Sequence, residues 1–308
     1  MKNRLSYFCS RVLFIGIGLS YLLDLNGSSL LISMVIGLII GYFIVDKTKY
    51  NKHNELILLL LISLGSSISN LCHTLYLENT SLLFIIIFTM FISFIISFIK
   101  RKAFIRLSEN LFNWSILIFI TMCLSLLPFI KIDYIKPFEV PNILNIIKGS
   151  ILFASTSILP SYVLNEKNKK EYLIGSISIL ILTFLILTVL GEKEALLYRY
   201  PEYVVLKRVR FLNFVSNFEN IFFFIILVDL IMVISLCYNK LIKNNKYYNI
   251  GLFVSTIIII YILTYYQKIL NVVYNTFPIF VIVTILMTFI SKKKKYNKQR
   301  LNYDNNRW

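Results

Sequence analysis

Apolar segments long enough to cross a bilayer recur along this chain from one end to the other. A helix needs about 20 mostly apolar residues to span the hydrocarbon core of a membrane. Hydrophobic residues make up 57% of the 308 positions and charged residues only 15%. We expect ten spans, at 7–23, 28–46, 55–77, 80–99, 111–130, 142–164, 171–190, 215–238, 250–267 and 272–291. The sequence therefore predicts an all-α polytopic membrane protein with ten transmembrane helices.

Positive charge indicates how these spans are oriented. The chain has 32 lysines and arginines against 15 acidic residues, a formal net charge of +17. Nucleic-acid binding is one interpretation of such an excess, but the cations form short clusters between apolar segments. We therefore expect no nucleic-acid partner. Counted by alternate sides of the membrane, most of the cations fall on the side that holds both ends of the chain. The positive-inside rule then predicts that both termini are cytoplasmic.

The spans predict one transmembrane domain over 1–291 and a basic cytoplasmic tail over 292–308. Only "DLNG" separates the first two spans and only "ENT" the next two, which indicates tight hairpins. Ten spans divide into two sets of five, at about 7–130 and about 142–291. Because five is odd, the second set enters the membrane in the opposite orientation. Such an inverted repeat is typical of secondary transporters.

The segment 191–214, "GEKEALLYRYPEYVVLKRVRFLNF", lies between two spans and mixes charged with apolar residues. Its amphipathic composition indicates a helix that lies at the outer membrane interface. An ordinary extracellular loop is the alternative, and the sequence leaves both open.

Glycines interrupt the first span near its middle, in "LFIGIGLSYLL". Glycine costs up to about 1 kcal/mol relative to alanine inside a helix. Broken helices occur in the membrane only where they line a cavity or are covered by protein. In inverted-repeat transporters the freed backbone groups of such a helix hold charged groups of the substrate. We therefore predict substrate-binding residues at Gly16, Ile17, Gly18 and Ser20.

The corresponding helix of the second half, in "KGSILFASTSILPSYV", has a run of small polar residues at its centre, followed by Pro160. Proline removes a helical hydrogen bond, so we expect a second break at a matching depth. The predicted binding residues here are Phe153, Ala154, Ser155, Thr156 and Ser157. Small residues also let membrane helices pack closely, and this alternative remains open for both helices.

Asp229, in "FFFIILVDLIMVIS", is the deepest carboxylate of the predicted spans. A charge at the bilayer centre costs roughly 2.5–3.5 kcal/mol on insertion scales, so Asp229 should face the protein interior. It could serve as a proton or cation site, pair with a ligand amine, form a structural pair with a lysine or a hydroxyl, or be a protonated side chain. Arg11 and Lys148 lie near the starts of the two loosened helices, and we expect both to extend to an interface.

Polar residues also recur at near-helical spacing in the span 55–77, within "SLGSSISNLCH". Ser66 and Asn70 belong to this stripe and are candidates for lining the same cavity. Hydrogen bonding between helices is the alternative explanation.

No catalytic pattern is present. The sequence lacks the nucleophile elbow of hydrolases, a phosphate-binding Walker loop, an H-E-x-x-H pair and a dense carboxylate cluster. Four scattered cysteines without a C-x-x-C pair, together with two histidines, indicate no metal site. We therefore expect no enzyme activity, no catalytic residue, no metal and no cofactor.

Three stretches of the sequence resemble one known family. "FIGIGLSYLL" with "SSLLISMVIGLIIGYFIV" resembles the first two helices of spore-germination permeases, the B subunits of nutrient germinant receptors. These permeases belong to the amino acid/polyamine/organocation (APC) transporter superfamily. "GSILFASTSILPSYVLNEKNKKEY" is similar to their sixth helix and its lysine-rich exit. "YRYPEYVVLKRVRFLNFVSNFENIFFFIILVDLIMVISL" is similar to their extracellular stretch and eighth helix.

This resemblance implies a LeuT-like 5+5 inverted repeat in a bacterial cytoplasmic membrane and recognition of a small, amino acid-like nutrient. It also implies two partners, a larger membrane A subunit and a lipoprotein C subunit. Three functions remain open. The chain could be a germination-type permease that senses or transports a nutrient. It could be a proton- or cation-coupled amino acid transporter unrelated to germination. It could also be a non-transporting scaffold or envelope-assembly protein, whose glycines only pack helices.

Overall fold

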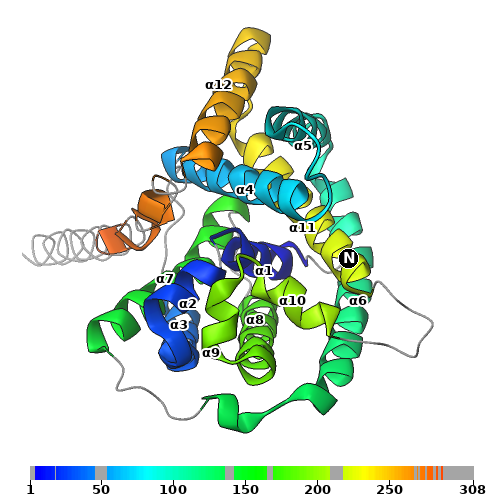
Figure 1. The fold of residues 1–308 in the computed structure, drawn as a ribbon. Helices are drawn as coiled ribbons and strands as arrows, with labels where there is room; N and C mark the ends of the chain where they lie inside the picture. Colours follow the sequence, from blue (N-terminus) through cyan, green and yellow to red (C-terminus); the bar gives the residue numbers. More distant parts are fainter. Residues whose placement is uncertain are drawn as a thin grey trace, which may run out of the picture.

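The structure is helical throughout the part of the chain that it describes. It is a computed structural model that describes residues 4–17, 19–45, 54–135, 142–164, 169–208, 218–266, 269, 271–274, 276–279, 282–283 and 286. No residue in these ranges forms a strand. Helix α1 lies near the centre of the molecule, between one group of helices that includes α4 and α11 and another that includes α8 (Figure 1).

Within the described residues, the first half begins with one helix on either side of Gly18 and continues with four longer ones. Their bounds are Leu5–Ile17 for α1, Leu19–Asn26 for α2, Leu30–Ile44 for α3, Asn54–Leu75 for α4, Leu82–Ile96 for α5 and Arg101–Leu126 for α6. Three short 3-10 turns join them or follow them, η1 at Gly27–Ser29, η2 at Leu127–Phe129 and η3 at Ile132–Ile135.

In the part of the second half that the structure describes, there are four long helices and two short ones. Their bounds are Ile143–Leu164 for α7, Lys169–Leu190 for α8, Glu192–Leu197 for α9, Pro201–Lys207 for α10, Phe218–Leu241 for α11 and Lys246–Tyr265 for α12. Helical residues also occur within 271–279, at the start of the tenth expected span.

Five helices in the described ranges are long and apolar enough to cross a membrane. They are α4, α6 with η2, α8, α11 and α12, while α3 and α5 are shorter apolar helices. This confirms that the chain is an all-α membrane protein. The count of ten spans stays a prediction, because much of 272–291 lies outside the described residues.

The helices pack in two groups. One contains α1, α2, α3, α7 and α8, and the other contains α4, α5, α11 and α12. Helix α1 contacts both groups, through α8 and α7 on one side and α11 and α4 on the other. Helix α6 lies beside α1, α8 and α11 (Figure 1). The first helix of the chain is therefore enclosed by helices from both halves.

Two glycines bring the first group together in a reciprocal way. A Cβ atom on Gly37 of α3 would come within 2.5 Å of the Ser150 carbonyl oxygen and 2.9 Å of the Phe153 Cβ on α7. A Cβ atom on Gly175 of α8 would come within 2.9 Å of the Tyr7 carbonyl oxygen on α1. The second helix of each half thus packs closely on the first helix of the other half.

The connection between α2 and α3 is the tight hairpin that "DLNG" predicts. Gly27 has a φ of 51° there, in the left-handed region that glycine adopts without strain. The amphipathic segment is helical over 192–197 and 201–207, in two short helices, while 209–214 lies outside the described residues.

The contacts at helix ends sort into two faces, as a chain that alternates across a membrane requires. At one face lie the ends that the cation count assigns to the cytoplasm. There Arg4 pairs with Glu171, Arg101 donates to the Leu164 carbonyl at 2.7 Å, and Asn239 donates to the Ser97 carbonyl at 2.6 Å. At the other face the Lys131 backbone N–H donates to the Thr188 carbonyl at 2.9 Å, and Arg208 donates to the Val189 carbonyl at 2.9 Å.

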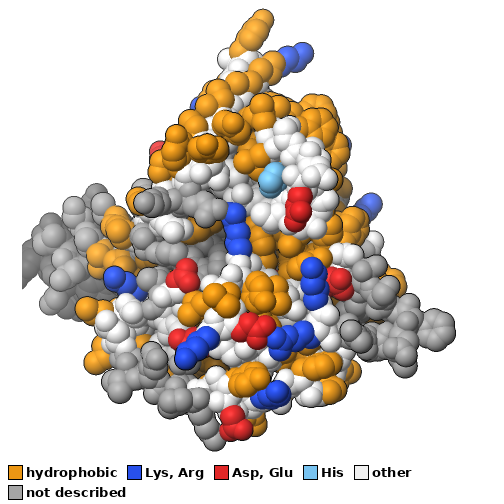
Figure 2. Space-filling model, viewed as in Figure 1, with side chains coloured by type: hydrophobic (Ala, Val, Ile, Leu, Met, Phe, Trp, Pro, Cys, Tyr) orange, Lys and Arg blue, Asp and Glu red, His pale blue; other side chains and the backbone are white. Residues whose placement is uncertain are grey.

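Large apolar side chains cover the outer surfaces of the helices. On α5, Phe84 and Phe88 are more than half exposed, and on α6 the same holds for Trp114 and Leu124. Figure 2 shows a mostly hydrophobic surface over α5 and α12, whereas charged side chains of both signs gather over α8, α9 and α10. The apolar surfaces fit a lipid environment, because lipid tails are as apolar as these side chains.

We predict that Gly37→Ala destabilises the protein. The added Cβ meets backbone atoms of α7 that cannot move aside, and such overpacking costs about 1–3 kcal/mol. Gly251→Ala is the matched control, because an added Cβ on this helical glycine meets nothing within 4 Å. The control should be stabilised by about 0.4–1 kcal/mol. Thermal unfolding in detergent measures both, and equal effects of the two substitutions would contradict the close α3–α7 contact.

Candidate functional site: a buried arginine–aspartate pair

Helix α1 carries a column of charged and aromatic side chains. Arg4, Tyr7 and Arg11 follow one another at spacings of three and four residues, so they share one face of the helix. Phe112 of α6 packs against this face, with its ring 4.9 Å from the Tyr7 ring and 4.1 Å from the Arg4 guanidinium. The face is turned toward α6, α8 and α11, which supply the polar partners of the column.

Arg11 is buried among three helices. Its Nη2 atom pairs with Oδ2 of Asp229, half-way along α11. Its Nη1 atom donates to the Ser115 Oγ on α6 at 2.6 Å and to the Tyr7 hydroxyl at 3.0 Å. Arg11 is 4% exposed and Asp229 is fully buried. An arginine keeps its proton inside proteins, so this buried cation needs a counter-ion, and Asp229 supplies it.

The pair is incompletely satisfied. Arg11 Nε and Asp229 Oδ1 are both buried, and neither has a hydrogen-bond partner. Leaving such atoms unpaired costs free energy, more for charged groups than for neutral ones. One donor on a cation and one acceptor on an anion therefore remain open, and together they could bind a carboxylate and an ammonium group.

A second pair lies at the beginning of α1. Arg4 binds Glu171 at the start of α8, and the Glu171 Oε2 atom is buried without a partner. The two pairs thus fasten α1 to a helix of each group, α8 in the first and α11 in the second.

The structure corrects the expectation for Arg11. We expected its side chain to extend to an interface, but it is held inside by Asp229, Ser115 and Tyr7. An ion pair within reach is more favourable than a long path to water. Lys148, by contrast, is exposed. For Asp229 the structure shows an ion pair with an arginine, and its role as a proton or cation site stays a prediction.

The expected break in the second half is wrong. Helix α7 is continuous from Ile143 to Leu164, through the run of small polar residues and past Pro160. The hydroxyl of Ser155 donates to the Leu152 carbonyl at 2.5 Å, so this serine is satisfied within its own helix. Phe153 and Ala154 are buried, and both face the close contact with Gly37. This face of α7 packs against α3, as the packing alternative proposed.

Several of the predicted binding residues cannot be placed fully. Gly18 lies outside the described residues. Gly16 and Ile17 lie within α1, Ser20 within α2, and Thr156 and Ser157 within α7, but their side chains lie outside what the structure describes. Whether the chain opens at Gly18 therefore stays a prediction.

Ser66 and Asn70 are buried in α4 and differ in their bonding. The Ser66 hydroxyl bonds the Thr264 hydroxyl of α12 at 3.1 Å, which is hydrogen bonding between helices. The Asn70 Nδ2 atom is buried without a partner. Only Asn70 is thus free to bind something else.

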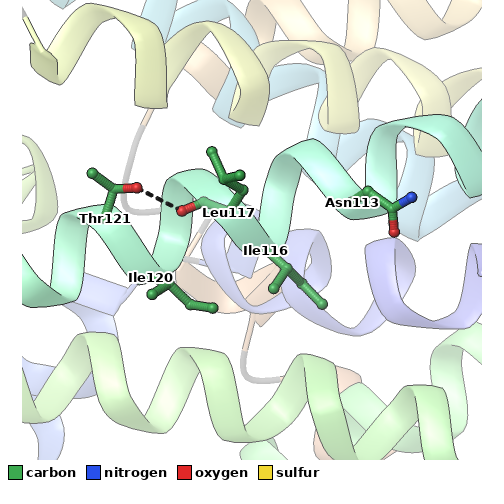
Figure 3. A pocket seen from close by; sticks show the side chains of 5 residues that line it. All are labelled: Asn113, Ile116, Leu117, Ile120 and Thr121. Carbon is green, nitrogen blue, oxygen red and sulfur yellow. Dashed lines mark hydrogen bonds between the residues drawn. The ribbon is translucent and has the colours of Figure 1, made fainter.

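A shallow pocket of about 360 Å³ lies on α6, away from the predicted residues. Its lining consists of Asn113, Ile116, Leu117, Ile120 and Thr121, all on one helix. Figure 3 shows these side chains spread along the helix, with the Thr121 hydroxyl bonded to the Leu117 carbonyl. No charged group lines the pocket, so it offers little to a polar ligand.

Sequence reasoning missed Arg4, Tyr7, Ser115 and Glu171. Arg4, Tyr7 and Arg11 are spaced three and four residues apart in "RLSYFCSR", and this spacing could have indicated a polar face on the first helix. Their partners lie more than 100 residues away along the chain, so no local pattern indicated them.

Comparison with models of protein families finds no match for this sequence, and comparison with curated proteins finds none either.

We predict that Arg11→Gln and Asp229→Asn each lower the free energy of unfolding by about 3–5 kcal/mol, because each leaves a buried charge unpaired. The double variant R11Q/D229N should lose less than the sum of the two, since it removes both charges. Glu194→Gln is the control. It breaks the pair between Glu194 and Arg208, whose side chains are 35% and 37% exposed, respectively. The free energy of unfolding should therefore change by no more than about 1 kcal/mol. Denaturant unfolding measures all four, and additive losses in the double variant would contradict the coupling.

Proposed function

We propose that this protein is a spore-germination-type permease or receptor subunit that binds a small, amino acid-like nutrient inside the membrane. The nutrient binds where α1 faces the two helix groups, between the C-terminal end of α1 and the Arg11–Asp229 pair. The fold that goes with this function is a ten-span, LeuT-like inverted repeat.

The reciprocal exchange of helix partners is the observation that carries this proposal. Helix α3 packs on α7 through Gly37, and α8 packs on α1 through Gly175. In the proposed repeat, α1 corresponds to α7 and α3 to α8, so each contact is the counterpart of the other. The second group shows the same exchange of partners. In the proposed repeat α4 corresponds to α11 and α5 to α12, and α5 contacts α11 while α12 contacts α4. Inverted repeats of this kind are typical of transporters that bind substrate at the interface of the repeats.

The buried charges give the binding region its chemistry. Ionisable residues within a membrane are costly and commonly mark substrate or ion pathways. Arg11 has an open donor and Asp229 an open acceptor. An amino acid has one charged group for each of them, so it could bind to both ends of the pair. Gly16 follows Arg11 on α1 within about two turns, which keeps this part of the predicted backbone site near the pair.

A scaffold function is the second candidate, and the unbroken α7 favours it. Ala154 and Phe153 pack against α3 with no room for a side chain on Gly37. In this alternative the glycines only bring helices together, and the charged column fixes the position of α1. A proton- or cation-coupled transporter unrelated to germination is a third candidate function for the same site. Measuring uptake into proteoliposomes distinguishes a transporter from a sensor.

The resemblance extends the proposal to the setting of the protein. The chain would lie in a bacterial cytoplasmic membrane with both termini in the cytoplasm. It would act together with a larger membrane A subunit and a lipoprotein C subunit.

A nutrient ligand should raise the thermal unfolding temperature of the purified protein, because a ligand that binds only the folded state stabilises it. A screen of amino acids, sugars and nucleosides finds the ligand. We expect Gly16→Leu and Gly18→Leu to abolish the shift, since leucine fills the space that the backbone offers there. Gly251→Leu is the control and should keep the shift, because Gly251 is an exposed helical glycine.

The outcome separates the candidates. If no nutrient shifts a folded sample, and the two α1 variants only unfold at lower temperature, the scaffold function is favoured and the permease proposal fails.

The proposed orientation predicts which exposed lysines face the outside of a cell. A cysteine introduced by Lys131→Cys should react with a membrane-impermeant maleimide on intact cells. One introduced by Lys246→Cys should react only after the cells are permeabilised. Both positions are exposed, so accessibility depends on the side of the membrane alone. The unsubstituted chain gives the background from its four native cysteines. The reverse pattern would overturn the assignment of both termini.

A further inference from the structure

Helix α6 leaves most of its surface uncovered by the other described helices. Only 22% of its apolar stretch is buried, against 67% in α8 and in α11. The inner face of α6 carries Phe112 and Ser115, which contact the charged column of α1. The opposite face is used by none of these contacts. In a membrane protein, such a face meets lipid or another molecule within the bilayer.

One exposed stripe runs along this outer face. Its members recur at spacings of three and four residues, so they share one side of the helix. They are all exposed, and they are Lys102, Arg106, Asn110, Asn113, Leu117 and Ile120. Their chemistry changes in order along the helix, from two cations through two amides to two apolar side chains. We call these residues the α6 stripe.

The pocket on α6 lies over the amide and apolar part of the stripe. Asn113, Leu117 and Ile120 belong to its lining, and its volume is about 360 Å³ (Figure 3). Leu117 is 57% exposed and Ile120 is 51% exposed. A hollow lined mainly by leucine and isoleucine, on a surface that faces lipid, fits an acyl chain.

The polar residues of the stripe are free to bind another molecule. Across the described ranges of the chain, Lys102, Arg106, Asn110 and Asn113 form no hydrogen bond or ion pair. Asn113 lies within the apolar sequence that begins at Leu111. An amide that faces hydrocarbon has unsatisfied donors and an unsatisfied acceptor, which costs free energy. A group that accepts hydrogen bonds is therefore favourable beside Asn113.

The charges of the stripe indicate which molecule covers it. Lys102 and Arg106 attract an anion, and Glu109, the one carboxylate in the sequence of α6, is half-buried rather than exposed. A second copy of the chain would have the same orientation in the membrane, and contacts between copies are most often two-fold symmetric. Two α6 helices in such a contact would place Lys102 and Arg106 against the same cations of the other copy. Like charges across an interface are unfavourable, whereas an anionic lipid avoids this repulsion.

We propose that the α6 stripe is a binding site for an anionic phospholipid. The two cations pair with the phosphate of the headgroup, the two amides donate to the ester oxygens, and one acyl chain lies in the pocket. Basic clusters next to a spanning helix are typical of sites for anionic lipids. This site is separate from the one at α1 and does not depend on the proposed function.

Trp114 can report on this lipid, because it follows Asn113 and is 64% exposed. The chain has one other tryptophan, and Trp308→Phe leaves Trp114 as the only one. Brominated lipid quenches the fluorescence of a tryptophan that it contacts. We compare brominated phosphatidylglycerol with brominated phosphatidylcholine in bilayers that contain the full W308F chain. At low salt we expect a preference of about ten-fold or more for phosphatidylglycerol, since each cation contributes about five-fold. High salt should reduce this preference.

Three substitutions in the W308F chain test the cations. Lys102→Gln and Arg106→Gln should each lower the preference by about five-fold, and together they should remove it. Lys246→Gln is the matched control, because it removes an exposed cation from a different helix, α12, and should leave the preference unchanged. Equal preferences in K102Q/R106Q and K246Q would overturn the proposal.

The same measurement identifies other occupants. If neither brominated lipid quenches Trp114 in folded protein, a protein helix covers this face and the proposal is wrong. If both lipids quench it equally at low salt, the stripe does not select an anionic headgroup, and the proposal is wrong as well. Glycerophosphoglycerol has the headgroup without acyl chains and should not displace the brominated lipid. Displacement would show a site for a soluble phosphodiester instead of a lipid.

The amides are tested by how firmly the lipid is held. Native mass spectrometry of the full chain, released from detergent, measures the fraction that retains phosphatidylglycerol. Asn113→Leu should lower this fraction several-fold, because the ester oxygens lose a donor. Asn54→Leu is the control, since Asn54 is an exposed asparagine of α4. Equal retention in the two variants would contradict the placement of the lipid along the stripe.

Discussion

The architecture depends on how closely two helix backbones can approach in lipid. Apolar surfaces gain little by meeting each other in a solvent that is itself apolar, so association depends on packing and on polar contacts. Gly37 and Gly175 remove the side chains that would keep α3 from α7 and α8 from α1. Ser33, Gly37 and Gly41 form a buried stripe of small residues on α3, whereas the exposed side of the helix carries large apolar residues, Ile32, Val35, Ile36, Ile39 and Phe43. The central position of α1 follows from these contacts.

Once α1 is enclosed, its polar groups must find partners within the protein. Arg11 finds Asp229 and Ser115, and Arg4 finds Glu171. These contacts link α1 to α6 and α11, which the glycine packing does not do, and they add an ion pair to the α1–α8 contact at Gly175. Small residues thus set the distance between helices, and the charges set which face of α1 meets which helix. A substitution of the small residues should therefore affect the charged contacts, and the reverse should also hold, because both sets of contacts act on α1.

Much of the fold could be predicted from the sequence because it depends on local patterns. Apolar length predicts the helices, and "DLNG" predicts the hairpin where Gly27 takes a positive φ. The Arg11–Asp229 pair could not be predicted, since 218 residues separate its members. From the local sequence alone, Arg11 was expected to reach an interface and Asp229 to face the interior. The break in α7 was predicted wrongly because small polar residues were read as loosening a helix. Ser155 instead bonds the carbonyl three residues before it, which keeps the helix intact.

The distribution of buried polar atoms without hydrogen-bond partners says more about the function of the protein than the distribution of its charges. A fold that used its buried charges only for stability would gain by satisfying every donor and acceptor, because each open atom costs free energy. Among the described residues, one buried side-chain atom each remains open in Arg11, Asn70, Glu171, Ser176, Glu202 and Asp229. Arg11 and Asp229 contact each other, so an open donor and an open acceptor occur together in one buried pair. A helix pair held for packing alone has no use for such pairs, whereas a site that binds a polar molecule needs them. The open atoms therefore argue for binding more strongly than the unbroken α7 argues against it.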